Sequence, residues 1–141
     1  MINNFEDLEV WKACRILRKQ VSIVVKSFPS EEKYRMVDQL IRASRSITAN
    51  IAEGHGRYHY QENIQFCRQA RGSLSETLDH YICALDENYI SMDQLNIFRN
   101  QYNLCLKILN GYIAYLQKMK LNESNKPNTK SQSLESSETP K

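Results

Sequence analysis

The stretch "SRSITANIAEGHGR", residues Ser44 to Arg57, is too polar for an ordinary core and too apolar for an ordinary loop. Small side chains dominate it, and a second run of small side chains, "QARGSLSE" at 69–76, follows. Small side chains on two helices let the backbones approach closely, and a helical glycine costs about 1 kcal/mol relative to alanine unless packing offsets that cost. We therefore expect these two stretches to lie on adjacent helices that cross closely.

This expected crossing has a defined set of residues. The helix that contains Ser44 to Gly54 is predicted to end at Gly54, in the left-handed conformation that glycine adopts readily. Asn50, Glu53 and Glu76 are expected near the crossing, where buried polar groups must find hydrogen-bond partners. Their candidate partners are Ser73, Arg42 and Arg45.

Gly72 is expected to face Ala49 across the contact. The predicted helix-packing motif comprises Ser46, Asn50, Glu53, Gly54, Gly72, Ser73 and Glu76.

Four segments carry apolar residues at alternating steps of three and four, which places them on one face of a helix. They span residues 10–28, 30–54, 61–87 and 91–119. The chain has only four glycines and three prolines, so few positions would break long helices. Because the connections are short, the pattern predicts an all-α fold, an antiparallel up-down-up-down four-helix bundle.

Local signals mark the ends of these helices. Pro29 stops the first helix, and Ser30 is expected to cap the second, with two glutamates in its first turn. Ser91 and Gln94, three residues apart, have the pattern of a capping box at the start of the fourth helix. The second and fourth helices are therefore expected to begin at defined residues.

Composition divides the chain into two parts. Residues 1–121 are predicted to form the bundle domain. Residues 122–141 contain almost no large apolar side chain and cannot offset the entropy of ordering, so they are predicted to form a disordered polar tail. The N-terminus carries acids where a secretory signal would carry basic residues, and the most apolar run is far too short to cross a bilayer. We expect a cytoplasmic protein without membrane contact, whose four separated cysteines are free thiols.

The net charge of +3 is modest, but its distribution is uneven. Residues 12–45 contain nine Lys or Arg against three acids, whereas residues 46–91 carry an excess of acids. Lys12, Lys19 and Lys26 are seven residues apart and fall on the outer face of the first helix. Such a surface either faces phosphate groups or is the solvated face of ordinary helices. The candidate nucleic-acid-binding residues are Lys12, Arg15, Lys19, Lys26, Arg35, Arg42, Arg45 and Arg57.

The connection "EGHGRYHYQ" at 53–61 is a second candidate site. Its cations and aromatics could stack on unpaired bases, or Tyr58 and Tyr60 could plug the end of the bundle, which is the favoured interpretation. His55 and His59 have flanking glycines and no third ligand at a defined spacing, so no metal site is predicted.

Catalysis is not expected. The sequence contains no Gly-rich phosphate loop and no hydrolase or metalloprotease motif. Glu53 and Glu76 could meet as paired carboxylates, but they lack the Glu-x-x-His partners of di-iron bundles. No cofactor is predicted.

Four stretches of the chain resemble a known family. The relevant strings are "FEDLEVWKACRIL", "SFPSEEKYRMVDQL", "SRSITANIAEGHGR" and "ARGSLSETLDHY". They are similar to the four-helix-bundle proteins encoded in intervening sequences of bacterial 23S ribosomal RNA genes, a family similar to the accessory variability proteins of diversity-generating retroelements. The likeness covers residues 5–120. It is strongest in the ordered set Ser46, Ile47, Asn50, Ile51, Ala52, Glu53 and Gly54, followed by Gly72, Ser73, Leu74 and Glu76.

The resemblance implies a small bundle that assembles into a homo-oligomeric ring, a pentamer, and binds nucleic acid or a nucleic-acid enzyme without catalysis of its own. Apolar residues beyond the core positions also favour self-association. These residues are Ile16, Ile41, Ile64, Ile82, Leu104, Ile108, Ile113 and Tyr115.

Two functions of different class follow from these observations. The first is a homo-oligomeric accessory protein that binds RNA or DNA through its basic outer faces. The second is a protein-interaction module that docks a nucleic-acid enzyme such as a reverse transcriptase and does not bind nucleic acid directly.

Overall fold

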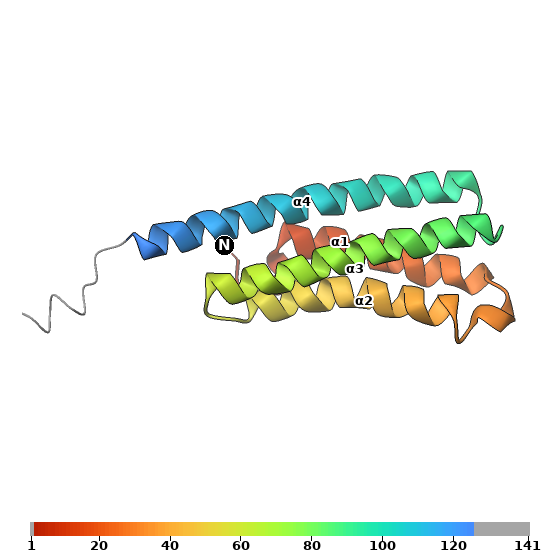
Figure 1. Cartoon of the computed structure of the whole chain (residues 1–141), viewed down its shortest axis with the longest axis horizontal. Helices are drawn as coiled ribbons and strands as arrows, with labels where there is room; N and C mark the ends of the chain where they lie inside the picture. The colour runs from red at the N-terminus through yellow and green to blue at the C-terminus, as the bar shows by residue number, and fades with distance from the viewer. Residues whose placement is uncertain (1, 126–141) are drawn as a thin grey trace, which may run out of the picture.

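The computed structural model describes residues 2–125 of the 141-residue chain. These residues form four α-helices and three short 3-10 helices, and no strand occurs among them. The α-helices are α1 (Glu9–Val24), α2 (Met36–His55), α3 (Tyr60–Asp86) and α4 (Met92–Ser124), and the 3-10 helices are η1 (Phe5–Asp7), η2 (Val25–Ser27) and η3 (Ser30–Glu32). Successive α-helices run in opposite directions (Figure 1). The prediction of an all-α, up-down-up-down four-helix bundle is confirmed.

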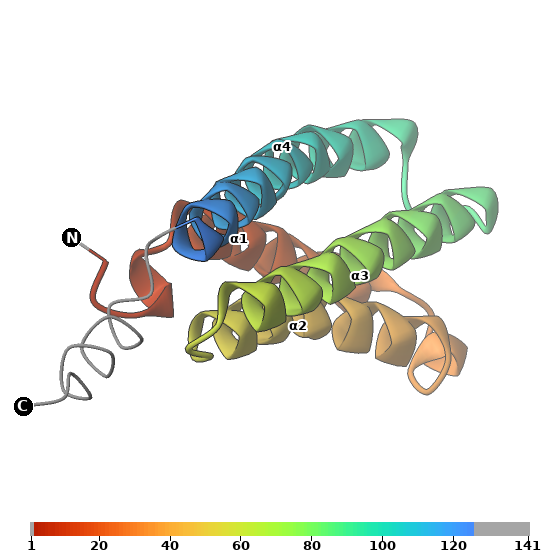
Figure 2. The same ribbon diagram turned by 60° about the vertical axis from the view of Figure 1, so that its left-hand side comes forward.

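Each helix of the bundle contacts two neighbours. Helix α1 packs against α2 and α4, and α3 packs against the same two helices from the opposite corner (Figure 2). The α2–α3 contact is the most extensive of the four. Helix α4 is the longest and projects beyond the others at its C-terminal end (Figure 1). None of the helices between residues 2 and 125 is both long and apolar enough to span a membrane.

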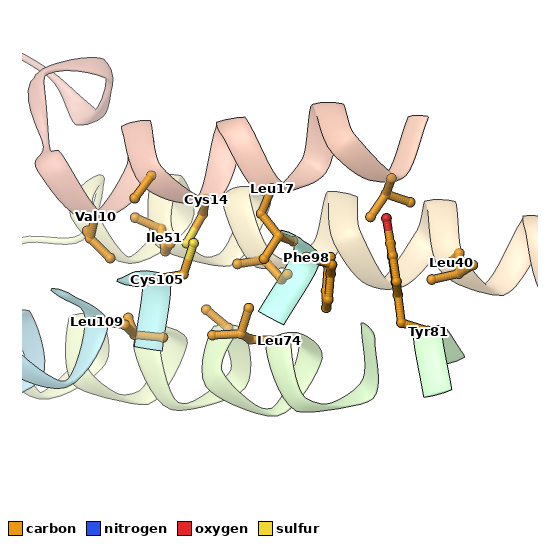
Figure 3. Close-up of a cluster of buried hydrophobic side chains, with 14 of the residues drawn as sticks. Val10, Cys14, Leu17, Leu40, Ile51, Leu74, Tyr81, Phe98, Cys105 and Leu109 are labelled. Carbon is orange, nitrogen blue, oxygen red and sulfur yellow. The ribbon is translucent and has the colours of Figure 1, made fainter. Parts of the chain in front are cut away.

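The core lies along the axis of the bundle, where the four apolar faces meet (Figure 3). Cys14 and Leu17 of α1 meet Cys105 and Phe98 of α4 there, and all four are buried. The Phe98 ring stacks on the Tyr81 ring of α3 with centroids 3.7 Å apart. Burial and close packing of these aliphatic and aromatic side chains provide the main stabilisation of the fold.

The ends of the helices follow the predicted signals in part. Ser91 and Gln94 form the capping box: the Ser91 hydroxyl accepts from the Gln94 amide at 3.2 Å, and the Gln94 side chain accepts from the Ser91 amide at 2.8 Å. The predicted Ser30 cap is wrong, because residues 30–32 form η3 and α2 begins only at Met36. There the carboxylate of Glu32 accepts from the Met36 amide at 3.2 Å.

The predicted left-handed end at Gly54 is also wrong. No glycine among the described residues has a positive φ, and α2 continues through Gly54 to His55. Glycine is needed at this position for space: a Cβ there would lie 2.6 Å from Asn63 Oδ1 and 2.9 Å from Phe66 Cβ of α3. The two helices therefore approach each other closely at Gly54.

The polar tail is described only at its start. Helix α4 continues to Ser124, beyond the predicted end of the bundle domain at residue 121, so residues 122–124 are helical. The rest of the predicted disordered segment, residues 126–141, lies outside the described residues.

Candidate nucleic-acid interface

The outer face of α1 carries a row of exposed cations. Because Cys14, Leu17 and Val21 occupy the opposite, buried face, the residues seven positions apart point outward. They are Lys12 and Lys19 of α1 and Lys26 of η2, the 3-10 helix that directly follows α1, with Arg15 of α1 beside them.

Helix α2 lies beside α1 and carries two exposed arginines, Arg42 and Arg45, and a third, Arg35, immediately precedes its first residue. Arg42 Nε forms an ion pair with Asp38 at 2.9 Å within the same helix. The outer faces of two neighbouring helices thus form one positively charged surface. We refer to Lys12, Arg15, Lys19, Lys26, Arg35, Arg42 and Arg45 as the basic face.

Most of the basic face is not neutralised by the protein. Lys12 contacts Glu9 at 3.5 Å, an exposed pair of the kind that contributes little, and Arg42 has Asp38. Within residues 2–125, the other five cations of the basic face form no ion pair. Their charge is therefore available to an external anion.

A groove runs between α1 and α2 on this side of the molecule. We call it the α1–α2 groove, and its volume is about 570 Å³. Phe5 of η1 and Trp11 of α1 form its wall, with ring centroids 5.3 Å apart in an edge-to-face arrangement. Ala49 and Ala52 of α2 line it on the other side. These two side chains are single methyl groups, so they leave space beside the aromatic wall.

The 3-10 helix η1 holds Phe5 in this wall. Asn4 caps η1 by accepting from the Glu6 amide at 2.7 Å, and Asp7 accepts from the Asn3 amide at 2.9 Å. The backbone amides of Asn3 and Asn4 lower the pKa of the Asp7 carboxyl, because they stabilise its charged form. These hydrogen bonds fix the conformation of the N-terminal turn, and the Phe5–Trp11 contact holds it against α1.

Three cations line the same groove: Arg18, Lys19 and Arg45. Arg18 donates to the Thr48 hydroxyl at 2.8 Å, a neutral partner that leaves the charge of the guanidinium uncompensated. Arg15 lies over the Trp11 ring, 5.6 Å from its centroid, a cation–π arrangement. Aromatic and cationic groups are therefore interleaved along one concave surface.

Arg57 stands at the far end of this surface. It borders a continuation of the groove that Phe5, Ala49 and Ala52 also line. Its guanidinium pairs with Glu53 at 2.8 Å and lies 3.6 Å from Glu62, so two carboxylates already neutralise it. Of the eight predicted nucleic-acid-binding residues, Arg57 is the most fully satisfied within the protein.

Small side chains serve two contacts rather than one. Ser46 of α2 accepts from the Ser73 hydroxyl of α3 at 2.9 Å, and Asn50 donates to the Ser46 carbonyl at 2.8 Å. The predicted pairing of Gly72 with Ala49 is wrong. Gly72 is exposed, with no atom within 4 Å of a Cβ built there, and Ala49 lines the groove on the α1 side of α2.

The predicted burial of Glu53 and Glu76 near the crossing is wrong as well. Both are exposed and pair locally: Glu53 with Arg57 of the α2–α3 connection, and Glu76 with His80 of its own helix at 3.4 Å. Solvent and local partners satisfy these carboxylates because both lie away from the buried α2–α3 contact.

The connection between α2 and α3 fits the plug interpretation for one tyrosine only. Tyr60 packs against the core, whereas Tyr58 is fully exposed. Between residues 2 and 125, no three His, Cys, Asp or Glu side chains are placed to hold a metal ion.

Several residues of the groove were missed by sequence reasoning, among them Phe5, Trp11, Arg18 and Ser22. Trp11 is the single tryptophan of the chain and stands one helical turn before Arg15, a local signal that could have been used. Phe5 and Arg18 reach the groove through tertiary packing, which no local pattern reports.

Comparison with known families decides where the chain belongs. A family model described as "23S rRNA-intervening sequence protein" matches residues 6–111. The chain belongs to this family. The matched residues include all of the basic face and the α2–α3 contact. A search of curated proteins finds no significant match.

Proposed function

We propose that this member of the 23S rRNA-intervening sequence protein family is a non-enzymatic, homo-oligomeric cytoplasmic protein that binds nucleic acid, RNA in particular, through the basic face. One observation carries the proposal: five cations of the basic face have no counter-ion among residues 2–125. The family description, which refers to ribosomal RNA, favours the same ligand class.

The basic face fits a polyanion better than a small ligand. Its cations are spread along two helices rather than converging on one point, so they match the repeating phosphates of a nucleic acid. Each phosphate contact releases condensed counterions, which makes binding depend steeply on salt. A homo-oligomer would repeat the face in every subunit and raise the avidity without any new contact.

Self-association is supported by a second surface, the apolar face of α1 and α4, which comprises Ile16, Ile23, Ile97, Leu104 and Tyr115. All five side chains are exposed. Of the eight extra apolar residues in the sequence, Ile64 and Ile113 belong to the core instead, and Ile41, Ile82 and Ile108 are partly buried against it. Gln20 borders a hollow on this face, and its Oε1 is buried without a hydrogen-bond partner among the described residues. A neighbouring subunit would cover the apolar groups and could supply a donor to Gln20.

Binding to a labelled mixed-sequence RNA, measured by fluorescence anisotropy at several salt concentrations, tests the proposal. Replacing the five unpaired cations of the basic face with glutamine should abolish binding at physiological salt while the circular dichroism of the bundle stays unchanged; these are Arg15, Lys19, Lys26, Arg35 and Arg45. A matched control replaces five exposed cations elsewhere and should retain binding; these are Arg68, Arg99, Lys107, Lys118 and Lys120.

Two outcomes would contradict the proposal. Equal loss of binding in both five-residue variants would show that RNA affinity depends on the net charge of the protein and not on the basic face. No binding of the purified protein at physiological salt would favour the alternative, a module that docks a nucleic-acid enzyme such as a reverse transcriptase.

Light scattering of the purified protein tests self-association separately. A ring, pentameric as the family resemblance implies, should dissociate when Ile23 and Leu104 are both replaced by glutamine. A wild-type protein that is already monomeric would refute the homo-oligomer and leave the RNA-binding test unaffected.

A further inference from the structure

The α1–α2 groove has a property that the proposed function does not require. Phosphate binding on an outer face needs exposed cations only, yet this groove contains two aromatic rings opposite a methyl-lined helix. Its volume of about 570 Å³ lies within the roughly 300–1,000 Å³ that is usual for ligand clefts. An apolar, ring-lined cleft inside a positively charged surface calls for a ligand with both a flat apolar part and negative charge.

The charges around the groove are matched to an anion. Lys19 and Arg45 form no ion pair among residues 2–125, and Arg18 bonds only to the neutral Thr48 hydroxyl. The one carboxylate that borders the continuation of the groove, Glu53, is paired with Arg57. The cations therefore remain uncompensated in the same groove that the two rings line.

Unpaired nucleotides have this combination of parts. Single-stranded nucleic acids bind to proteins through cations that follow the phosphates and aromatic side chains on which bases stack. In a duplex the bases are already stacked and paired, so they could not enter a cleft between two helices. The hydroxyl of Ser22 also lines the groove; it donates to the Arg18 carbonyl at 3.3 Å and keeps lone pairs that can accept from a ribose 2′-hydroxyl.

We propose that the α1–α2 groove binds an unpaired segment of RNA, with a base against Phe5 and Trp11 and the adjoining phosphates against Arg18, Lys19 and Arg45. This inference rests on the proposed RNA-binding function and names the form of RNA that the site selects. Ala49 and Ala52 are small because the base occupies the space above them. Arg15, which lies over Trp11, sits where it can contact a further phosphate.

The single tryptophan of the chain reports directly on this site. A 12-nucleotide oligouridine RNA should quench Trp11 fluorescence as it binds, whereas a self-complementary RNA duplex of the same length should not. The oligouridine should bind about tenfold more tightly than the duplex at the same salt, the size expected for one stacked base. Equal affinity for both RNAs with unchanged fluorescence would overturn the proposal.

A groove-filling variant separates this proposal from the proposed function. Ala49→Leu keeps a good helix former at an exposed position and should weaken oligouridine binding about tenfold, with duplex binding unchanged. Ala114→Leu, an equal change at an exposed position of α4, is the control and should bind both RNAs as the wild type does. Wild-type affinity in Ala49→Leu would refute the groove as the site while the basic face could still bind RNA.

Two further ligands complete the test. Oligodeoxyuridine should bind more weakly than the RNA because it lacks the 2′-hydroxyl, and equal affinity would overturn RNA as the ligand. A polyglutamate peptide that quenches Trp11 and displaces the oligouridine would instead assign the groove to an acidic protein partner. If neither RNA binds at all, the proposed function fails together with this inference.

Discussion

Gly54 of α2 lies so close to Asn63 of α3 that a Cβ on the glycine would be 2.6 Å from the Asn63 side-chain oxygen. Asn63 cannot easily move away, because it is buried and its amide group donates to the Tyr112 hydroxyl at 3.1 Å. The same amide oxygen accepts from the Cys67 thiol at 3.5 Å. One glycine thus sets the distance between two helices and positions a polar network that reaches α4.

The two glycines of the predicted packing motif should respond in opposite ways to alanine. Gly54→Ala is expected to lower the free energy of unfolding by at least about 1 kcal/mol, because overpacking exceeds the gain in helix propensity. Gly72→Ala should raise it by up to about 1 kcal/mol, since the added methyl meets no atom. Urea denaturation at one protein concentration measures both; destabilisation by Gly72→Ala would contradict the open position of that residue.

Phe98 is the largest fully buried side chain of the core, and its truncation should be severe. Phe98→Ala is expected to cost about 3–5 kcal/mol, because it removes the ring that stacks on Tyr81 and leaves a cavity. Asn96→Ala, two residues earlier and exposed, should change stability by no more than about 0.5 kcal/mol. Thermal and urea unfolding provide the comparison, and similar losses in the two variants would argue against the observed core.

The start of α4 depends on the Ser91–Gln94 capping box. Ser91→Ala should destabilise the protein by about 1 kcal/mol, since the Gln94 amide loses its acceptor. Ser91→Asp keeps an acceptor at the same position and should restore most of the stability. An alanine variant as stable as the wild type would show that the first turn of α4 does not need this cap.

Stability should fall in alkaline solution because of buried thiols. Burial raises the pKa of the Cys67 thiol to about 12, far above the roughly 8.5 of an exposed cysteine. Above pH 8.5 the unfolded chain loses this proton while the folded protein keeps it, so the unfolding free energy decreases as pH rises. Between pH 8 and pH 10 this group alone should cost roughly 2 kcal/mol.

Urea titrations at several pH values, under reducing conditions, measure this slope. Cys67→Ala should reduce the loss of stability per pH unit. Cys83→Ala should reduce it less, because that thiol is partly exposed and its pKa is raised by a smaller desolvation and by nearby carboxylates. An identical slope in wild type and Cys67→Ala would exclude the buried thiol as its source. Burial also raises the pKa of the Tyr81 phenol, so a further decline is expected at still higher pH.

Much of the fold could be predicted from local pattern. The three-four spacing from Val10 to Val21 and from Leu95 to Leu116 marks the buried faces correctly, because burial of a helix face requires that period. At the helix ends, the errors lie at Ser30 and Gly54. Both depend on contacts that the local pattern does not contain. Glu32, not Ser30, provides the acceptor at the start of α2. At Gly54, the packing of α3 leaves no room for a side chain.

The surface was predictable to a lesser extent. Lys12, Lys19 and Lys26 point outward as their seven-residue spacing predicts, since a residue opposite a buried stripe must face solvent. The groove was not predictable, because Phe5, Trp11 and Ala49 come from three separate elements. Each is an ordinary residue on its own.

The amino-acid sequence by itself determined four antiparallel helices, their buried faces and a cationic outer side, because each depends on periodicity and short connections within the chain. Only the tertiary structure decided which neighbour each remaining side chain meets. Periodicity gives the angle of a residue around its own helix, but the order of helices around the bundle decides what lies at that angle. Ala49 therefore faces the groove beside α1, while Gly54, five residues later, faces α3.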